Sequence, residues 1–242
     1  MNLPQPGDYI DMHTHSGKPA EGIFLIESLM AHEGKLPQDI SGVTYTYGIH
    51  PWFLTEKNSK QLLTSVENSV SYPNMIAIGE AGFDKLRGPD AELQLKVFNE
   101  QVAIAETCRK PVIIHCVKAW DELLAAKKNL KPRTPWMIHG FRGSVEMAKQ
   151  LLSKGMHLSF WFDYVMRSES TGLLKSLPRN RIFLETDGAD IDIRIIYEKV
   201  ARDLAISVDE LKSIVLANFM SFFAPNPPFT SFRAGSKGGL IH

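Results

Sequence analysis

The sequence predicts an α/β protein whose parallel strands form a distorted, TIM-like (β/α) barrel. Short apolar runs of four to six residues alternate with longer amphipathic segments, and this alternation is typical of repeated βαβ units. The chain has 242 residues, a length that suits the strands and helices of one barrel domain. No glycine-rich loop of the Rossmann or Walker type is present, so a closed barrel is favoured over an open nucleotide-binding sheet.

The predicted strands are short apolar runs, whereas the predicted helices carry apolar residues at a spacing of about 3.6. The strands are expected at residues 9–15, 22–26, 43–49, 75–79, 111–114, 136–138, 157–162 and 182–184. The helices are expected at residues 59–71, 91–109, 119–130, 144–154, 191–205 and 208–223. Ser144 is a suitable N-cap, Gly155 is a suitable residue after a helix end, and residues 207–210 have the pattern of a capping box.

The first βα unit is predicted to be abbreviated. Residues 16–41 include Pro19, Pro37, Gly17, Gly22 and Gly34, and they show no sustained helical period. Proline and glycine both disfavour the interior of a helix. We therefore expect no regular helix of three turns in this segment.

The charge balance limits the general affinities of the chain. Lysine plus arginine and aspartate plus glutamate each number 27, so the formal net charge is zero. Such a chain has no overall attraction to nucleic acid or to an anionic membrane, and any affinity for phosphate has to be local. No run approaches the roughly 20 apolar residues that a membrane span needs. We therefore expect no membrane association.

The chain is predicted to be one domain over residues 1–242, with a core at about 9–223 and an irregular tail at 224–242. The two cysteines, Cys108 and Cys116, have neither metal-binding nor redox spacing. The N-terminus also lacks a signal-like apolar segment. These features predict a cytoplasmic protein, and a monomer is favoured.

Side chains that can bind metal occur where five of the predicted strands end. His13 and His15 stand one residue apart after the first apolar run, so both imidazoles point to the same face of a strand. Four later runs end at Glu80, His115, His139 and Asp187. Because all strands of a parallel barrel point the same way, these six side chains should meet at its C-terminal face.

These side chains suit divalent metal ions. Imidazole favours Zn²⁺ or Ni²⁺, and carboxylates extend the choice to Mn²⁺ or Mg²⁺. Six ligands exceed the number that one four-coordinate ion needs, so we expect two ions that share a carboxylate. Two ions about 3.5–4 Å apart can activate a water molecule and bind a phosphoryl or carbonyl oxygen. The remaining carboxylate would accept the proton.

Six segments occur in a characteristic order, namely DMHTHSG, GIHPW, IAIGEAGFD, PVIIHC, IHGFRGS and FLETD. Together with the segment YEKVARDLAISVDELKSIVLANFMSFF, they resemble the TatD family of metal-dependent deoxyribonucleases, within the amidohydrolase-like barrels. The resemblance covers roughly residues 9–223. The family's characterised members cleave phosphodiester bonds in DNA, and some are linked to RNA or to D-aminoacyl-tRNA. The resemblance thus implies a nucleic-acid substrate, with DNA favoured.

The resemblance also implies roles for the six metal-binding residues. One ion would be held by His13, His15, Glu80 and Asp187. The second would be held by Glu80, His115 and His139, so that Glu80 bridges the two ions. Glu80 and Asp187 would be the catalytic residues, and Asp187 would orient or deprotonate the attacking water.

Substrate contacts are expected from side chains near the strand ends, namely His50, Trp52, Lys118, Arg142 and Trp161. The lysine and the arginine could bind phosphate, and the tryptophans could stack on bases. For His50, a structural role in the turn before Pro51 is the alternative.

Two other functions stay open. The first is a small-molecule hydrolase that uses the same metals on an amide, ester or phosphoester. The second is a catalytically idle metal-binding protein, against which the presence of all six ligands argues. The chain departs from the family pattern in its missing first helix, in the sequence TDGAD after the last strand, and in its tail. These departures concern the substrate more than the metal site.

Overall fold

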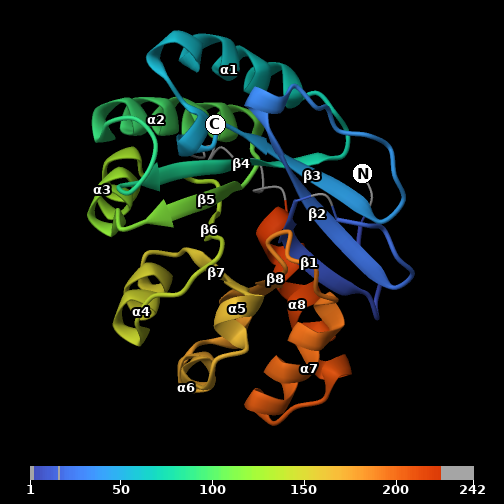
Figure 1. The fold of residues 1–242 in the computed structure, drawn as a ribbon. Helices are drawn as coiled ribbons and strands as arrows, with labels where there is room; N and C mark the ends of the chain where they lie inside the picture. Colours follow the sequence, from blue (N-terminus) through green and yellow to red (C-terminus); the bar gives the residue numbers. More distant parts are fainter. Residues whose placement is uncertain (1–2, 16, 225–242) are drawn as a thin grey trace, which may run out of the picture.

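The computed structural model describes residues 3–15 and 17–224, which form a nearly closed barrel of eight parallel strands (Figure 1). Each strand pairs with the next in sequence order. The strands are β1 (Tyr9–Thr14), β2 (Ile23–Met30), β3 (Val43–Gly48), β4 (Met75–Asp84), β5 (Val112–Val117), β6 (Trp136–Ile138), β7 (His157–Trp161) and β8 (Ile182–Glu185). The predicted barrel is confirmed.

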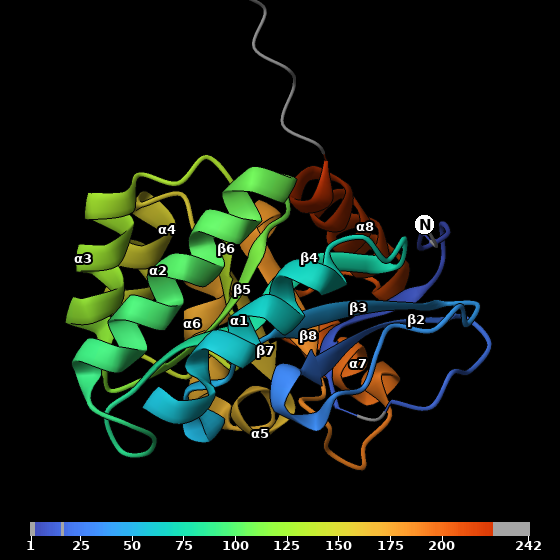
Figure 2. The same cartoon turned by 90° about the horizontal axis from the view of Figure 1, so that it is seen from above.

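The helices cover the outside of the barrel, and Figure 2 shows α1, α2 and α3 along one side of it. They are α1 (Glu56–Ser69), α2 (Ala91–Cys108), α3 (Trp120–Leu130), α4 (Val145–Ser153), α5 (Phe162–Val165), α6 (Ser168–Ser176), α7 (Ile193–Leu204) and α8 (Val208–Phe223). Three 3₁₀ turns are η1 (Ala31–Glu33), η2 (Pro51–Phe53) and η3 (Arg179–Arg181). The predicted N-caps Ser144 and Ser207 accept hydrogen bonds from the first turns of α4 and α8. No helix within the described ranges has the length and apolar character of a membrane span.

The abbreviated first unit is confirmed over residues 17–41, which contain β2 and η1 but no α-helix. Residues 17–22, which precede β2, thus contain no helix. Strand β2 is longer than the predicted run 22–26, because its apolar residues continue to Met30.

Strands β4 and β5 and residues 162–176 also differ from the sequence prediction. Strand β4 does not end at Gly79 but continues through Glu80 to Asp84. Strand β5 likewise runs past His115 to Val117. Residues 162–176, for which no helix is predicted, form α5 and α6. The apolar period of α6 is weak, but Leu173 and Leu174 are buried, so tertiary packing stabilises a helix that propensity alone does not specify.

The barrel closes between β1 and β8 through side-chain hydrogen bonds as well as a main-chain one. The N–H of Asp187 donates to the carbonyl of His13 at 3.0 Å. The N–H of Thr186 donates to Asp11 Oδ1 at 3.0 Å. The Tyr197 hydroxyl accepts from the N–H of Ile10 and donates to its carbonyl, both at 3.1 Å. These bonds satisfy polar groups at the open edge of β1, which would otherwise be buried without partners.

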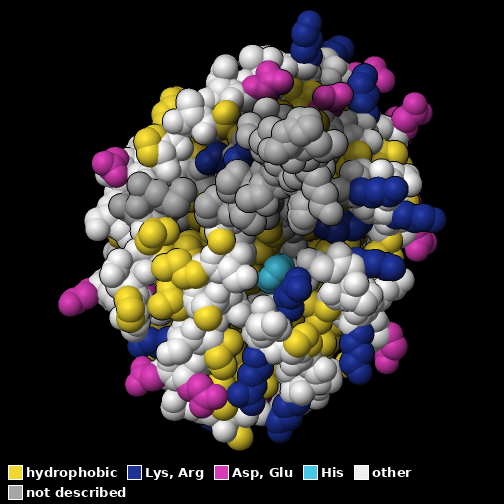
Figure 3. Space-filling model, turned by 180° about the vertical axis from the view of Figure 1, so that it is seen from behind, with side chains coloured by type: hydrophobic (Ala, Val, Ile, Leu, Met, Phe, Trp, Pro, Cys, Tyr) yellow, Lys and Arg dark blue, Asp and Glu magenta, His cyan; other side chains and the backbone are white. Residues whose placement is uncertain are grey.

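The two ends of the barrel differ in their residues. The carboxyl ends of the strands carry the predicted metal-binding side chains. Figure 3 shows the molecule from behind, the side on which the strands begin, and basic side chains gather there on one flank. Between the two ends the strands carry fully buried apolar residues, among them Ile78, Ile114 and Leu184.

Candidate metal centre

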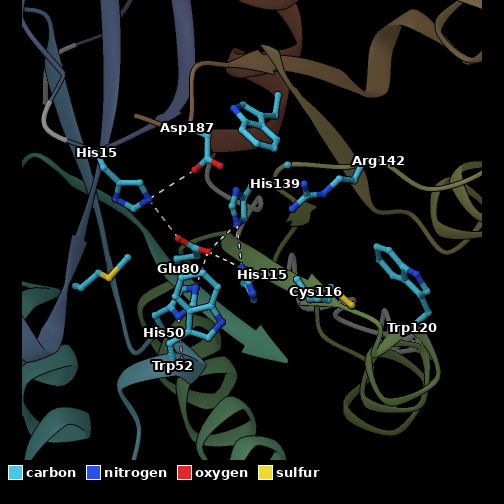
Figure 4. A pocket seen from close by; sticks show the side chains of 14 residues that line it. His15, His50, Trp52, Glu80, His115, Cys116, Trp120, His139, Arg142 and Asp187 are labelled. Atoms are coloured by element: carbon cyan, nitrogen blue, oxygen red, sulfur yellow. Dashed lines mark hydrogen bonds and ion pairs between the residues drawn. The ribbon is translucent and has the colours of Figure 1, made fainter. Parts of the chain in front are cut away.

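The structure brings together six side chains at the carboxyl ends of the strands, namely His13, His15, Glu80, His115, His139 and Asp187. Glu80 lies at their centre and is 2% exposed. Its Oε1 atom lies 2.7 Å from His139 Nε2 and 2.8 Å from His115 Nδ1. Figure 4 shows these imidazoles pointing toward one another around the carboxylate. Oε1 of Glu80 therefore faces one pair of histidines.

The other oxygen of Glu80 faces the two histidines at the end of β1, His13 within the strand and His15 just after it. Oε2 lies 3.4 Å from His13 Nε2 and 3.6 Å from His15 Nε2. Asp187 Oδ1 lies 3.7 Å from the same two nitrogen atoms. The two oxygens of Glu80 thus face two groups of donors, which also meet where the rings of His13 and His139 stack with their centroids 4.2 Å apart.

Close approach of β4 to its neighbours places Glu80 at this centre. The β4–β5 register shifts between Ile78 and Ala81, around Glu80. A Cβ atom on Gly82 would lie 2.0 Å from the carbonyl oxygen of His115, and one on Gly79 would lie 2.5 Å from that of Ile113. Only glycine fits at such separations. The Glu80 carboxylate thus lies in the segment IGEAG, where the pairing of β4 with β5 is irregular.

Asp187 is held by its backbone. It has φ = 52°, which is rare for a residue other than glycine. Its N–H donates to the carbonyl of His13, and this bond fixes the turn after β8 against β1. Backbone strain of this kind persists where the surrounding structure determines the conformation. The Asp187 carboxylate is therefore aimed at His13 and His15 while a quarter of its side chain stays exposed (25%).

The electrostatics of the cluster favour a cation. Burial alone would raise the pKa of Glu80, but the His139 charge and the hydrogen bonds from His115, His13 and His139 hold it well below its usual range. Burial also disfavours the imidazolium of His139, yet the charges of Glu80 and Glu185 raise its pKa well above the ordinary value. A positive charge is thus stabilised between the carboxylates, where a divalent ion would replace the proton.

Two of the histidines have a carboxylate on the ring nitrogen that faces away from Glu80. His115 Nε2 lies 3.1 Å from Asp84 Oδ2, which leaves Nδ1 directed at Glu80. His139 Nδ1 lies 3.4 Å from Glu185 Oε1, an ion-pair contact that is too poorly aligned to be a hydrogen bond. This carboxylate–imidazole arrangement is the usual support of a metal-binding histidine, because it fixes the tautomer and ring orientation.

His50 differs from these histidines. Its Nδ1 accepts a hydrogen bond from the N–H of Trp52 at 3.1 Å, so Nδ1 carries no proton. The neutral ring then has its proton on Nε2, which lies 3.1 Å from Glu80 Oε1. Burial lowers the pKa of His50, in agreement with a neutral ring. Although His50, Glu80 and His115 are close enough to form a metal site, the tautomer makes His50 a donor to Glu80.

The donor set fits divalent metal. Three groups of three side chains have ligand atoms within 4.8 Å of one another, and each includes at least one carboxylate. Two of them, His13–His15–Asp187 and His13–Glu80–His139, consist of residues predicted as ligands. Mixed imidazole and carboxylate donors suit Zn²⁺, Ni²⁺ or Mn²⁺. The ligand roles of the six residues stay a prediction, and their convergence is what the structure adds.

A pocket of about 350 Å³ opens above the cluster. Its lining includes four predicted substrate contacts, His50, Trp52, Arg142 and Trp161, but not Lys118, whose side chain is exposed. Met30, Cys116 and Trp120 also line the pocket and were not among the predicted substrate contacts. Cys116 and Trp120 follow His115 closely in the sequence, and this position could have predicted that they line the pocket.

Each side of this pocket carries an arginine above a tryptophan ring. The Arg87 guanidinium lies 4.1 Å from the centroid of Trp52, and that of Arg142 lies 5.0 Å from Trp161. Trp52 is further fixed by its indole N–H, which donates to Asp84 Oδ2 at 2.6 Å. Asp84 thus links a tryptophan at the rim to the imidazole of His115.

Comparison with known proteins agrees with the fold and the motifs. A family model described as TatD-related DNase matches residues 30–224. The 3′-5′ ssDNA/RNA exonuclease TatD of Erwinia tasmaniensis is 31% identical over 147 residues, which are 59% of this chain and 56% of that protein. The chain thus spans little more than half the length of that relative.

A second similar protein is the uncharacterized metal-dependent hydrolase YjjV of Escherichia coli, which is 28% identical over 195 residues, covering 73% of this chain and 74% of that one. The crystal structure of YjjV, a TatD homolog, superposes with a TM-score of 0.75 at 21% identity. The superposition covers 90% of this chain and 99% of the YjjV chain, and it supports the barrel fold.

Proposed function

Because the chain belongs to the family of TatD-related DNases, we propose that it is a hydrolase that uses two divalent metal ions to cleave phosphodiester bonds in nucleic acid. The observation that carries this proposal is the position of Glu80 between two groups of imidazole and carboxylate donors. Such a paired site suits reactions in which one centre holds the attacking oxygen and the other the leaving oxygen.

The proposed ligands divide by the oxygen of Glu80 that they face. His13, His15 and Asp187 would hold one ion with Oε2 of Glu80, and His115 and His139 would hold the other with Oε1. Two such ions supply Lewis acidity to a phosphoryl oxygen and lower the pKa of a water molecule. The metals considered are Zn²⁺, Mg²⁺, Mn²⁺ and Ni²⁺.

Asp187 would move the proton in this reaction. Its carboxylate faces the cluster and remains partly exposed to the pocket, so it can accept a proton from a water molecule and release it to solvent. His50 would orient Glu80 by donating its Nε2 proton to Oε1. Glu185 and Asp84 would fix the rings of His139 and His115.

The substrate would be held by the pocket walls. Arg142 can bind a phosphate, while Trp52 and Trp161 offer flat faces for bases, and stacking is worth about 1–3 kcal/mol per base. Lys118 would contribute only to a substrate that extends beyond the pocket. The name of the Erwinia relative includes both single-stranded DNA and RNA. We favour single-stranded nucleic acid, with DNA first, because a duplex would not expose its base faces to these rings.

The same cluster could hydrolyse a small amide or ester, and a substrate panel separates the two functions. Metal-loaded protein would be assayed on single-stranded DNA, single-stranded RNA, bis-p-nitrophenyl phosphate, and aryl ester and amide substrates. We expect turnover of the phosphodiesters, abolished by a chelator. Turnover of the esters or amides alone would contradict nuclease activity, and no turnover of any substrate would favour an idle metal-binding protein.

A further inference from the structure

The end of the barrel opposite the metal centre has two adjoining hollows. One is lined by residues at the beginnings of β6, β7 and β8 and by α8, and the other by α3 and α4. Each has a volume of about 560 Å³. Lys127, Pro132 and Lys154 line both, so the hollows form one continuous surface, hereafter the basic face.

The charge of the basic face has one sign. Its lining includes six cationic side chains and no aspartate or glutamate, although the whole chain has 27 acidic and 27 basic residues. The six are Lys127, Lys128, Lys131, Arg133, Lys154 and Arg181. Figure 3 shows blue side chains gathered on the flank of this end of the molecule, with few magenta ones among them.

Most of these cations have no acidic partner. Within residues 3–15 and 17–224, no carboxylate lies within ion-pair distance of Lys127, Lys128 or Lys154. The nearest acidic residue along this edge is Glu106, whose carboxylate already accepts hydrogen bonds from Arg133 and Thr134. The charges of Lys127, Lys128 and Lys154 are therefore available to an external anion.

Two titrating groups of this face have lowered pKa values. Lys127 lies with Nζ 4.5 Å from the ring centroid of the buried Trp136, and burial lowers its pKa to about 8. At the floor of the hollow, burial and the charges of Arg181 and Lys127 lower the pKa of His157 to about 4. An anion at this face would compensate charges that the protein itself leaves uncompensated.

Lysines at the end of a helix commonly stabilise its dipole, and Lys127 and Lys128 at the end of α3 do so here. The same role covers Lys154, the C-cap of α4, but it does not account for Arg181, which precedes β8. The cations are spread over two hollows on long flexible side chains, rather than converging on one point. This distribution suits a chain of phosphates better than one small anion.

We propose that the basic face binds the phosphate backbone of a nucleic-acid strand. This binding goes beyond the proposed hydrolysis, because it requires neither metal nor turnover and lies at the other end of the barrel. It would increase the affinity for long strands without sequence preference, since contacts to phosphate carry no base information.

The test is strand binding by chelator-treated protein, measured as fluorescence anisotropy of a labelled single strand of about 20 nucleotides. K127Q/K154Q removes two charges from the basic face, and K57Q/K60Q removes two exposed charges from α1 as the matched control. Each lost phosphate contact lowers the salt slope of a single strand by about 0.7. We expect K127Q/K154Q to weaken binding by about tenfold or more near 0.1 M salt and to reduce the slope by about 1.4. The control should behave as the unmodified protein.

A second variant guards against misfolding. K128Q/K131Q changes only exposed side chains and should weaken binding in the same direction. Hydrolysis of bis-p-nitrophenyl phosphate by the metal-loaded variants should be unchanged, so loss of strand binding and failure of the proposed hydrolysis are separate results. Equal affinities and slopes in all variants would refute the proposal. So would displacement of the strand by low concentrations of inorganic phosphate, or binding to anionic lipid vesicles but not to the strand.

Discussion

At the scale of single residues, the hydrogen-bond partner of each imidazole determines whether it can bind metal. His115 and His139 each have a carboxylate on the ring nitrogen opposite the cluster, whereas His50 accepts the N–H of Trp52 and presents a protonated nitrogen to Glu80. A ring nitrogen that carries a proton has no lone pair for a metal ion. All three imidazoles lie at similar distances from Glu80 Oε1, so distance does not show which of them can bind metal. The tautomer of each ring does.

His50→Ala should therefore retain both metal ions but bind them more weakly. Loss of a partner that orients a ligand typically costs about 10–100-fold in metal affinity or activity. Metal titration followed by isothermal calorimetry would measure this change. His50→Gln, which can still donate a proton to Glu80, should recover part of the loss. Complete loss of one ion in His50→Ala, as for removal of a true ligand, would show that the tautomer assignment is wrong.

Asp187 is the residue on which the proposed chemistry depends most directly. Asp187→Asn keeps the size and one oxygen but cannot accept a proton at pH 7. General-base assistance is worth about 10²–10⁴ in rate, so kcat should fall by about that factor while at least one metal ion and substrate binding are retained. Arg142→Ala should instead mainly raise KM for a phosphate substrate. A near-normal kcat in fully metal-loaded Asp187→Asn would exclude it as the essential base.

The residue types of the metal centre could be predicted from sequence, because they stand near the ends of five separate apolar runs. The supporting contacts could not be predicted. Asp84 and Glu185 act on histidines from other strands, and the Nδ1 partner of His50 is a main-chain N–H in a 3₁₀ turn. Such contacts depend on how side chains of distant segments are oriented. Neither the composition of the chain nor the spacing of its apolar residues specifies that orientation.

At the scale of elements, strand boundaries were the weakest part of the sequence prediction. The run MIAIG suggests that β4 ends at Gly79, because the next residues are polar or small. In the structure Gly79 and Gly82 allow β4 to lie against its neighbours, and the strand continues to Asp84. Gly79 and Gly82 therefore do not mark the end of the strand. They occur within β4 because only glycine allows its backbone to approach the main chain of β5 so closely.

The join between β1 and β8 also depends on a side chain that no pattern identifies. Tyr197 on α7 is fully buried, and its hydroxyl forms hydrogen bonds with both main-chain groups of Ile10. Tyr197→Phe should lower the free energy of unfolding by about 1–3 kcal/mol, because a buried N–H loses its partner. Urea denaturation would measure the loss. Tyr72→Phe, at a partly exposed ring, is the control and should change stability by less than about 0.5 kcal/mol. Equal effects would mean that water or another group satisfies Ile10.

At the scale of the whole molecule, the alternation of strands and helices was sufficient to predict the barrel, and the ordered motifs were sufficient to predict the family. Both predictions are confirmed. The single-domain boundaries, the cytoplasmic location and the monomeric state stay predictions. The tail predicted to be irregular lies outside the described residues, apart from Ala224. The basic face was not predicted, because Lys154 and Arg181 join the cations of residues 127–133 only in the folded barrel.

The end of the barrel where the strands begin should also affect the pH dependence of stability. His157 is buried there with a folded pKa of about 4, compared with about 6.5 when unfolded. The unfolded chain therefore binds more protons between these values, so the stabilising contribution is present above pH 6.5 and is lost as the pH falls toward 4. From pH 7 to pH 5 the unmodified protein should lose about 1–2 kcal/mol more than His157→Gln. Urea denaturation of metal-free protein at both pH values measures this difference, and parallel losses would contradict the assignment.

The central claim is that one carboxylate, Glu80, joins two metal sites. The most direct test is the number of metal ions per chain in purified, metal-loaded protein, measured by native mass spectrometry. The account predicts two ions in the unmodified protein, one in His139→Ala, and loss or weakening of both in Glu80→Ala, because each oxygen of Glu80 faces one of the two groups of donors. Equal losses in His139→Ala and Glu80→Ala would contradict the bridging role, and a single ion in the unmodified protein would contradict the two-metal site itself.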